Sequence, residues 1–199
     1  MLLINSLNGP FNADTVEGLG ANVACQVVDI IKKGKKKAKE NLKKFLKGEI
    51  GVSEMVRNEN FSALSRAYIP YSSIDEDTER INLRQGMAFA SVYINAFDTD
   101  NDGAMSIEEA GPVGGIIDSI DNSGKITAGK FLSWLIFQDC ASVLNGVLSP
   151  NEINRALMVV NRNPAFVAEK LREIYKGYKI DELERNFELP LPKESGSCN

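Results

Sequence analysis

Twelve residues near the middle of the chain form the pattern that most restricts how it can fold. The segment from Asp98 to Glu109 reads Asp-Thr-Asp-Asn-Asp-Gly-Ala-Met-Ser-Ile-Glu-Glu. Alternating aspartates place three carboxylates on one side of a tightly wound loop. Gly103 follows the third aspartate and lets the backbone turn sharply, which a residue with a Cβ would resist. The sequence therefore predicts a compact acidic loop at this point.

Helical periodicity borders this loop on both sides. Before it, apolar residues recur at three- and four-residue intervals and predict a helix from Thr78 to Phe97. After it, the segment from Thr127 to Gln138 is densely apolar, which is typical of a buried helix. The stretch from Thr15 to Leu46 also has a helical pattern, and Gly34 is a point where it would divide into two helices.

Shorter signals complete an all-α prediction. Residues 53–68 are expected to form another helix, and residues 70–77 have the composition of a polar linker. Ser149 has the position of a helix N-cap, with Pro150 as the first helical residue and Glu152 completing a capping box. A further helix is expected to begin at Pro164.

Composition narrows the chemistry that the chain can carry. It contains no histidine, which excludes zinc sites built on imidazole, Ser-His-Asp triads and histidine general bases. A metal must then be held by oxygen, and oxygen ligands favour Ca²⁺, Mg²⁺ or Mn²⁺. No phosphate-cradling glycine motif is present, so we do not expect an enzyme. The net charge of −4 is too small to indicate a nucleic-acid partner.

The Asp98–Glu109 segment resembles the loop of the EF-hand superfamily at each position that matters. The resemblance implies a Ca²⁺ site in a helix-loop-helix array, with a carbonyl oxygen from the seventh residue and two carboxylate oxygens from the twelfth. The implied ligands are Asp98, Asp100, Asp102, the carbonyl of Ala104, Ser106 directly or through water, and Glu109. Met105 occupies the position that joins paired loops through a short β-bridge. The alternative is an acidic loop followed by a capping box, because Ser106 and Glu109 also fit that pattern.

A second loop aligns if Gly124 takes the glycine position. Its first three ligand positions then fall on Ser119, Asp121 and Ser123. Ile126 would take the bridge position, and Lys130 would stand at the twelfth, where its positive charge opposes calcium binding. Asp118 lies one residue before the expected first ligand, so a one-residue insertion would recruit it. We expect this loop to be a structural partner of the first, and a weak calcium site is the alternative.

A third loop aligns around Gly146, with Leu148 at the bridge position and Glu152 at the twelfth. Ala141 and Val143 stand where aspartates are needed, so we expect a turn followed by a capped helix. The three glycines are 21 and 22 residues apart, which resembles closely spaced bacterial EF-hand arrays. Pro112 and its neighbouring glycines interrupt the helix that should leave the first loop. An unpaired third loop would lead to a homodimer, as in EF-hand families with an odd number of hands.

The predicted fold is thus an EF-hand array with an additional N-terminal helical region. Residues 1–70 form a basic helical region, 78–160 the EF-hand region, 161–189 a C-terminal helical segment and 190–199 a disordered tail. The first of these includes a Lys-rich stretch, residues 32–47, with nine lysines and one acid. An ordinary packed helix with a solvated face explains it, but a basic amphipathic helix also suits an anionic membrane or a target-binding groove.

Such a groove would lie on the apolar helix near Trp134. Its walls would include Phe131, Trp134, Leu135 and Phe137. In one hypothesis the Lys-rich stretch occupies this groove until calcium binds. The simpler alternative is that these side chains belong to the core.

The three cysteines are scattered and do not form a disulfide framework. We expect Cys25 and Cys140 to be buried thiols and Cys198 to be exposed, which favours a reducing, cytoplasmic location. No apolar run is long enough for a signal peptide or a transmembrane helix.

Two functions follow from the loop. The first is a calcium-responsive interaction protein that contacts a partner through an apolar groove. The second is a calcium buffer or a calcium-stabilised structural module without a switch.

Overall fold

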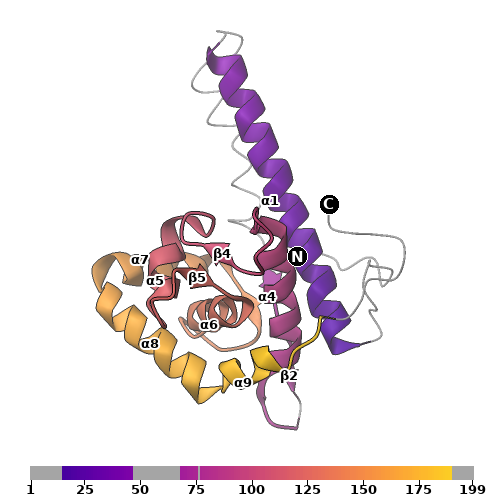
Figure 1. The fold of residues 1–199 in the computed structure, drawn as a ribbon, viewed down its shortest axis with the longest axis vertical. Coiled ribbons are helices and arrows are strands. Elements are labelled where there is room, and N and C mark those ends of the chain that lie inside the picture. The colour runs from indigo at the N-terminus through magenta and orange to yellow at the C-terminus, as the bar shows by residue number, and fades with distance from the viewer. Residues whose placement is uncertain (1–14, 47–67, 76, 190–199) are drawn as a thin grey trace.

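The computed structural model describes residues 15–46, 68–75 and 77–189, and this part of the chain is mostly helical, as predicted (Figure 1). The helices are α1 (Val16–Leu46), α4 (Leu83–Phe97), η1 (Gly111–Val113), α5 (Gly114–Asp118), α6 (Ala128–Asp139), α7 (Pro150–Arg162), α8 (Pro164–Gly177) and α9 (Ile180–Arg185). The strands are β1 (Ile69–Pro70), β2 (Ile74–Asp75), β3 (Arg80–Ile81), β4 (Met105–Ser106), β5 (Lys125–Ile126) and β6 (Val147–Leu148). The helix expected at 53–68 and the tail at 190–199 lie outside the described residues, apart from Tyr68.

Helix α1 is continuous, so the predicted division at Gly34 is wrong. Its first half packs closely against α4. A Cβ at Gly20 would lie 2.3 Å from the carbonyl oxygen of Gln85, which shows how near the two backbones approach. The second half of α1 extends away from the other helices (Figure 1). The Lys-rich stretch therefore continues along this projecting helix as far as Leu46, where the described part of it ends.

Helices α4 and α6 form the centre of the core. Met87 and Ala90 of α4 and Leu132 and Ile136 of α6 are fully buried. Helix α4 begins at Leu83 rather than Thr78, because the side chain of Asn82 caps it by accepting a hydrogen bond from the backbone N–H of Gln85. None of the helices in the described part of the chain combines the length and the hydropathy that a membrane-spanning helix needs.

The predicted linker at 70–77 instead contributes Pro70 to β1 and Ile74 and Asp75 to β2, and these strands belong to two short strand pairs. Strand β2 pairs antiparallel with β3, with Ile74 opposite Ile81. Asp75 closes the turn between them, because its Oδ1 accepts hydrogen bonds from the N–H and the hydroxyl of Thr78. Local sequence indicated only that this segment is polar, and an Asx turn explains why it doubles back on itself.

Two further strand pairs connect the loops. Strands β4 and β5 place Met105 opposite Ile126, as predicted for paired loops. The third loop also has a partner, because β6 pairs with β1 and places Leu148 opposite Ile69. The expectation that this loop is unpaired is therefore wrong, and the reason for expecting a homodimer through it is removed. The pairing was missed because the two strands are far apart in the sequence.

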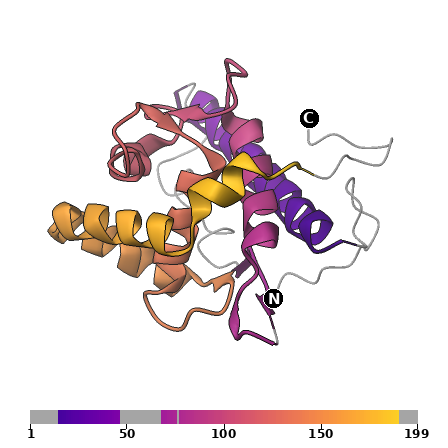
Figure 2. The ribbon, with the colours of Figure 1, turned by 60° about the horizontal axis from the view of Figure 1, so that its bottom comes forward.

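The C-terminal helices pack against α6 and share its core (Figure 2). The predicted capping box at the start of α7 is present: Ser149 and Glu152 each accept a hydrogen bond from the other's backbone N–H. Asn163 caps the start of α8, because its side-chain Oδ1 accepts a hydrogen bond of 3.2 Å from the backbone N–H of Phe166. The regions predicted as N-terminal, central and C-terminal all contribute to one hydrophobic core.

The cysteine predictions need two corrections. Cys25 is buried as expected, but it is disulfide-bonded and not a thiol. Cys140 is a free cysteine and is exposed, because it follows the last turn of α6 where the chain reaches the surface. The disulfide removes the ground on which a reducing location was expected. Cys198 lies outside the described residues.

Replacing Tyr71 by phenylalanine should destabilise the fold. Tyr71 is fully buried, and its hydroxyl donates a hydrogen bond of 3.0 Å to Oδ2 of the buried Asp139. Removing that donor leaves the carboxylate with fewer partners, so we expect the free energy of unfolding to fall by about 1–2 kcal/mol in urea denaturation. Tyr68→Phe is the control, because Tyr68 is 54% exposed. Equal losses in both variants would contradict a role for the buried hydrogen bond.

Candidate metal centre

The Asp98–Glu109 loop begins where α4 ends. Asp98 caps the C-terminus of the helix, and its backbone N–H donates to the carbonyl of Ile94 at 2.8 Å. Its side chain organises the turn, because Oδ2 accepts the N–H of Gly103 at 2.8 Å and Oδ1 accepts that of Asn101 at 2.9 Å. Gly103 has a φ of +88°, a left-handed conformation that suits glycine. The loop therefore turns as the sequence predicted.

Three of the predicted ligands converge in this loop. One carboxylate oxygen from each of Asp98, Asp100 and Asp102 lies within 4.8 Å of the others, and Asp98 is buried while the other two are exposed. The pKa of Asp100 is raised, first because its carboxyl shares a hydrogen bond with Asp98 and next because Asp102 is negatively charged. A proton or a cation is thus favoured between these groups, so protons compete with a bound metal increasingly as the pH falls.

Glu109 is held at the edge of this cluster by hydrogen bonds. Its Oε1 accepts the N–H of Thr99 at 2.9 Å and also the Thr99 hydroxyl. Its Oε2 accepts the N–H of Ser106 at 2.8 Å, and the Ser106 hydroxyl accepts the N–H of Glu109 at 3.2 Å. These bonds, with the Thr99 hydroxyl contributing most, lower the pKa of Glu109 to about 2. The predicted capping-box pattern is present, and the carboxylate also reaches across to the start of the loop.

The remaining predicted ligand residue, Ala104, is buried and lies beside the aspartates. Its N–H donates to Oδ1 of Asp102 at 3.0 Å. Asp102 also forms an ion pair with Lys125 of the neighbouring strand β5, with 2.8 Å between Nζ and Oδ2. This hydrogen bond from Lys125 lowers the pKa of Asp102. A side chain from the second loop therefore competes for one of the carboxylates of the first.

As the sequence predicted, the segment that follows this loop is interrupted and does not form a regular helix. A turn leads into the short helices η1 and α5. Gly114 packs tightly here, because a Cβ at this position would lie 2.2 Å from the carbonyl oxygen of Ile107. Pro112 stands in the first turn of η1, where proline is tolerated, but it prevents a regular helix from running through this point from the loop.

The second loop is one residue longer than the simple alignment assumed. Asp118, not Ser119, occupies the first position, because Oδ1 of Asp118 accepts the N–H of Gly124 at 2.9 Å. The hydroxyl of Ser119 donates instead to the carbonyl of Ile116 at 2.6 Å. Lys130 is 1% exposed, and its ammonium lies inside the loop.

The third loop is two residues longer than the alignment assumed. Its first carboxylate is Asp139, whose Oδ2 accepts the N–H of Gly146 at 2.7 Å. Both Asp139 and Glu152 are buried and hydrogen-bonded, Asp139 to Tyr71 and Glu152 to Ser142 and Ser149. Alignment at a fixed length placed Ala141 at the first position and so missed Asp139. The loop has the predicted character of a turn followed by a capped helix.

An apolar groove of about 400 Å³ begins beside the first loop. Its lining includes Val27, Ile31, Phe89, Tyr93, Met105, Glu109, Ala110, Gly111, Phe131, Trp134 and Leu135. Phe131, Trp134 and Leu135 line the groove and are also buried members of the hydrophobic core, as the simpler alternative predicted. Phe137 is not among the lining residues and stacks on Trp134 with ring centroids 5.7 Å apart. The groove is walled by the first half of α1, so the hypothesis that the Lys-rich stretch fills it is not supported. Glu109 places the candidate metal loop at its rim.

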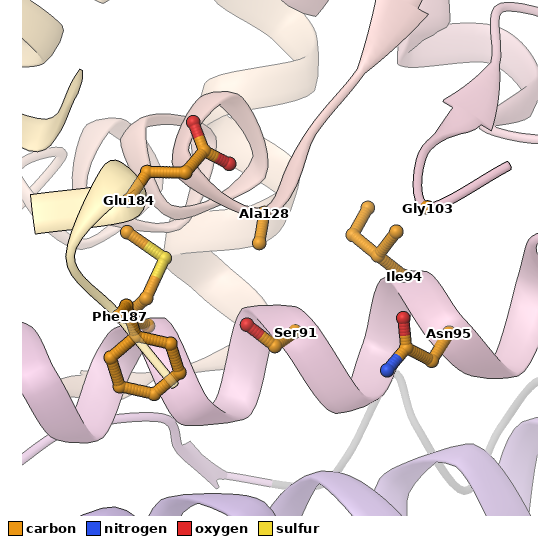
Figure 3. Close-up of a pocket in the computed structure, with 8 residues that line it drawn as sticks. Ser91, Ile94, Asn95, Gly103, Ala128, Glu184 and Phe187 are labelled. Carbon is orange, nitrogen blue, oxygen red and sulfur yellow. The ribbon is translucent and has the colours of Figure 1, made fainter. Parts of the chain in front are cut away.

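A smaller cavity of about 170 Å³, which Gly103 helps to line, lies between α4, α6 and α9 (Figure 3). Ser91 and Asn95 line it from α4, and Glu184 lines it from α9. The Glu184 carboxylate is already occupied, because it accepts the N–H of Gly129 at 2.7 Å and the hydroxyl of Thr127 at 3.1 Å. Glu184 therefore serves to hold the N-terminus of α6 in place.

The arrangement around Asp98 can hold a hard cation, and the part of the chain that the structure describes contains no second cluster of three such acidic, histidine or cysteine side chains. Comparisons with protein-family models, curated proteins and solved structures give no match.

Replacing Lys125 by glutamine should strengthen the binding of a divalent cation at this cluster. The variant removes a positive charge that is bound to Asp102 and leaves the carboxylate available to the cation. We expect the dissociation constant, measured by calorimetry, to fall roughly twofold to fivefold, as for the loss of an exposed ion pair. The gain should shrink at high salt, because salt screens the charge. Lys176→Gln, an exposed site on α8, is the control, and weaker binding by Lys125→Gln would contradict the prediction.

Proposed function

We propose that this chain binds calcium in the Asp98–Glu109 loop as an EF-hand type of helix-loop-helix. The observation that carries the proposal is the convergence of three carboxylates within 4.8 Å on a loop that turns at a left-handed glycine. The pairing of β4 with β5 supports it, because paired loops are typical of this family. The ligands would be those predicted: the three aspartates, Ser106, the Ala104 carbonyl and Glu109.

Calcium suits this site better than magnesium. The loop offers more than six oxygens, counting two from Glu109, and two of its three aspartates, Asp100 and Asp102, are exposed and adjustable. Calcium accepts six to eight oxygens in flexible geometry, whereas magnesium requires a near-ideal octahedron at shorter distances. Repulsion among the three carboxylates favours binding of either divalent cation, since its charge neutralises most of that repulsion.

A calcium-responsive interaction protein is the function that we favour. Glu109 would have to exchange its hydrogen bonds to Thr99 and Ser106 for bonds to the ion. The residues that follow it, Ala110 and Gly111, line the apolar groove together with Glu109 itself. A movement of Glu109 towards the ion would therefore change the rim of the groove, and with it the apolar surface that a partner can contact.

One observation favours the alternative of a structural module without a switch. The segment after Glu109 is broken into a turn, η1 and α5, and Gly114 is packed against the carbonyl of Ile107. A broken exit segment transmits less rotation than a continuous helix, because a rigid helix carries a displacement along its whole length.

The calcium proposal predicts a measurable ligand effect on stability. Wild-type protein stripped of metal should bind one calcium ion in calorimetry. At one hundred times the dissociation constant, binding should stabilise the fold by about 2.7 kcal/mol and raise the melting temperature by roughly 5–10 °C. Asp98→Ala and Glu109→Gln should abolish both effects. Glu108→Gln is the matched control, because Glu108 is exposed and stands next to the ligand. No heat from millimolar calcium with the wild type would refute the proposal.

The response of the groove separates a sensor from a structural module. Trp134 is the chain's single tryptophan and lines the groove, so its fluorescence reports on that surface. A sensor should change Trp134 emission on adding calcium and bind more of an apolar fluorescent dye. The Asp98→Ala variant should show neither change. A rise in melting temperature with unchanged emission and dye binding would favour the structural module.

A further inference from the structure

Lys130 is a buried lysine in a position that would ordinarily disfavour one. It lies in the first turn of α6 and is 1% exposed. The N-terminus of a helix has a partial positive charge, so a cation there is unfavourable unless other groups compensate. Lysine is also among the residues least often fully buried. Strong local contacts are therefore needed to hold its ammonium in this place.

Four oxygens surround the Lys130 ammonium. Nζ donates to the carbonyl oxygen of Lys125 at 2.5 Å, to the hydroxyl of Ser123 at 2.8 Å and to Oδ1 of Asp121. Oδ1 of Asp118 lies 3.4 Å away and completes the shell. An ammonium has only three N–H groups. The oxygens thus enclose the nitrogen in the way that ligands enclose a small cation.

These four oxygens match the predicted metal ligands of the first loop when the two loops are aligned on their glycines. Asp118 and Asp98 each accept the N–H of the loop glycine. The other three correspond by their distance from that glycine: Asp121 to Asp100, Ser123 to Asp102, and the carbonyl of Lys125 to that of Ala104. Lys130 itself corresponds to Glu109.

We propose that the ammonium of Lys130 is a built-in cation that takes the place of a metal ion in the second loop. The residue that would supply the last carboxylate to an ion supplies the positive charge instead. This loop is then ordered at all calcium concentrations and binds no calcium in the wild-type chain. It also supports the first loop, since β5 stays fixed and pairs with β4 whether or not the first loop holds an ion.

Replacing Lys130 by glutamate should convert the second loop into a calcium site. The change removes the built-in cation and places a carboxylate at the position that corresponds to Glu109. Calorimetry with calcium up to millimolar concentration should detect one more bound ion in Lys130→Glu than in the parent. Lys176→Glu makes the same charge change on the exposed surface of α8 and should add none. A folded Lys130→Glu protein with unchanged stoichiometry would overturn the proposal.

The same substitution in a Glu109→Gln background separates this proposal from the calcium function of the first loop. The double variant should bind one ion where Glu109→Gln alone binds none. If the first loop were not a calcium site, the wild type would bind none and Lys130→Glu would still bind one. The two proposals therefore fail independently.

A second variant and a measurement on the wild type cover the case in which Lys130→Glu does not fold. Lys130→Met keeps the aliphatic stem but leaves Asp118 and Asp121 without their cation, so its melting temperature should fall by about 10 °C relative to Lys176→Met. In the wild type, nitrogen-15 NMR should detect one lysine ammonium whose hydrogens exchange slowly with water. Equal melting temperatures, or no protected ammonium, would overturn the proposal.

Discussion

The same type of hydrogen bond sets the geometry of each of the three loops: a carboxylate at the start of the loop accepts the N–H of the glycine at its turn. The pairs are Asp98 with Gly103, Asp118 with Gly124 and Asp139 with Gly146, at 2.8, 2.9 and 2.7 Å. Each glycine has a positive φ. The chain between carboxylate and glycine lengthens by one residue from each loop to the next, but the bond is kept. The strand after each glycine consequently has the same role, pairing β4 with β5 and β6 with β1.

This shared geometry creates a shared electrostatic problem, because it places carboxylates where little water reaches them. The second loop solves it with the Lys130 ammonium, and the third with the Tyr71 hydroxyl and two backbone N–H groups on Asp139. In the first loop two of the three aspartates are exposed, and one of them, Asp102, forms an ion pair with the exposed Lys125. The first loop therefore has both the excess negative charge and the open approach that an external ion needs.

Local patterns predicted what local interactions determine. Apolar periodicity located α1, α4 and α6, and the Ser149–Glu152 pair located the start of α7. Alternating aspartates located the first cluster, which the structure brings together. The pairing of β1 with β6 and the role of Tyr71 could not be predicted, because they join residues more than sixty positions apart. Asp139 was missed because a fixed loop length was assumed. Lys130 was recognised as an obstacle to calcium, but only its contacts indicate that it replaces the ion.

Because α6 is held firmly in place, a structural change caused by calcium in the first loop should extend into one neighbouring segment alone. Helix α6 is fixed at both ends, by Lys130 in the second loop and by Asp139 in the third, and Glu184 also holds its N-terminus. Helix α4 is packed along α1 and α6. The remaining segment attached to the first loop is the turn after Glu109, which is short, irregular and open to the groove. Because the neighbouring elements are held by contacts that need no ion, a change at Glu109 would be confined to this segment and to the groove that it borders.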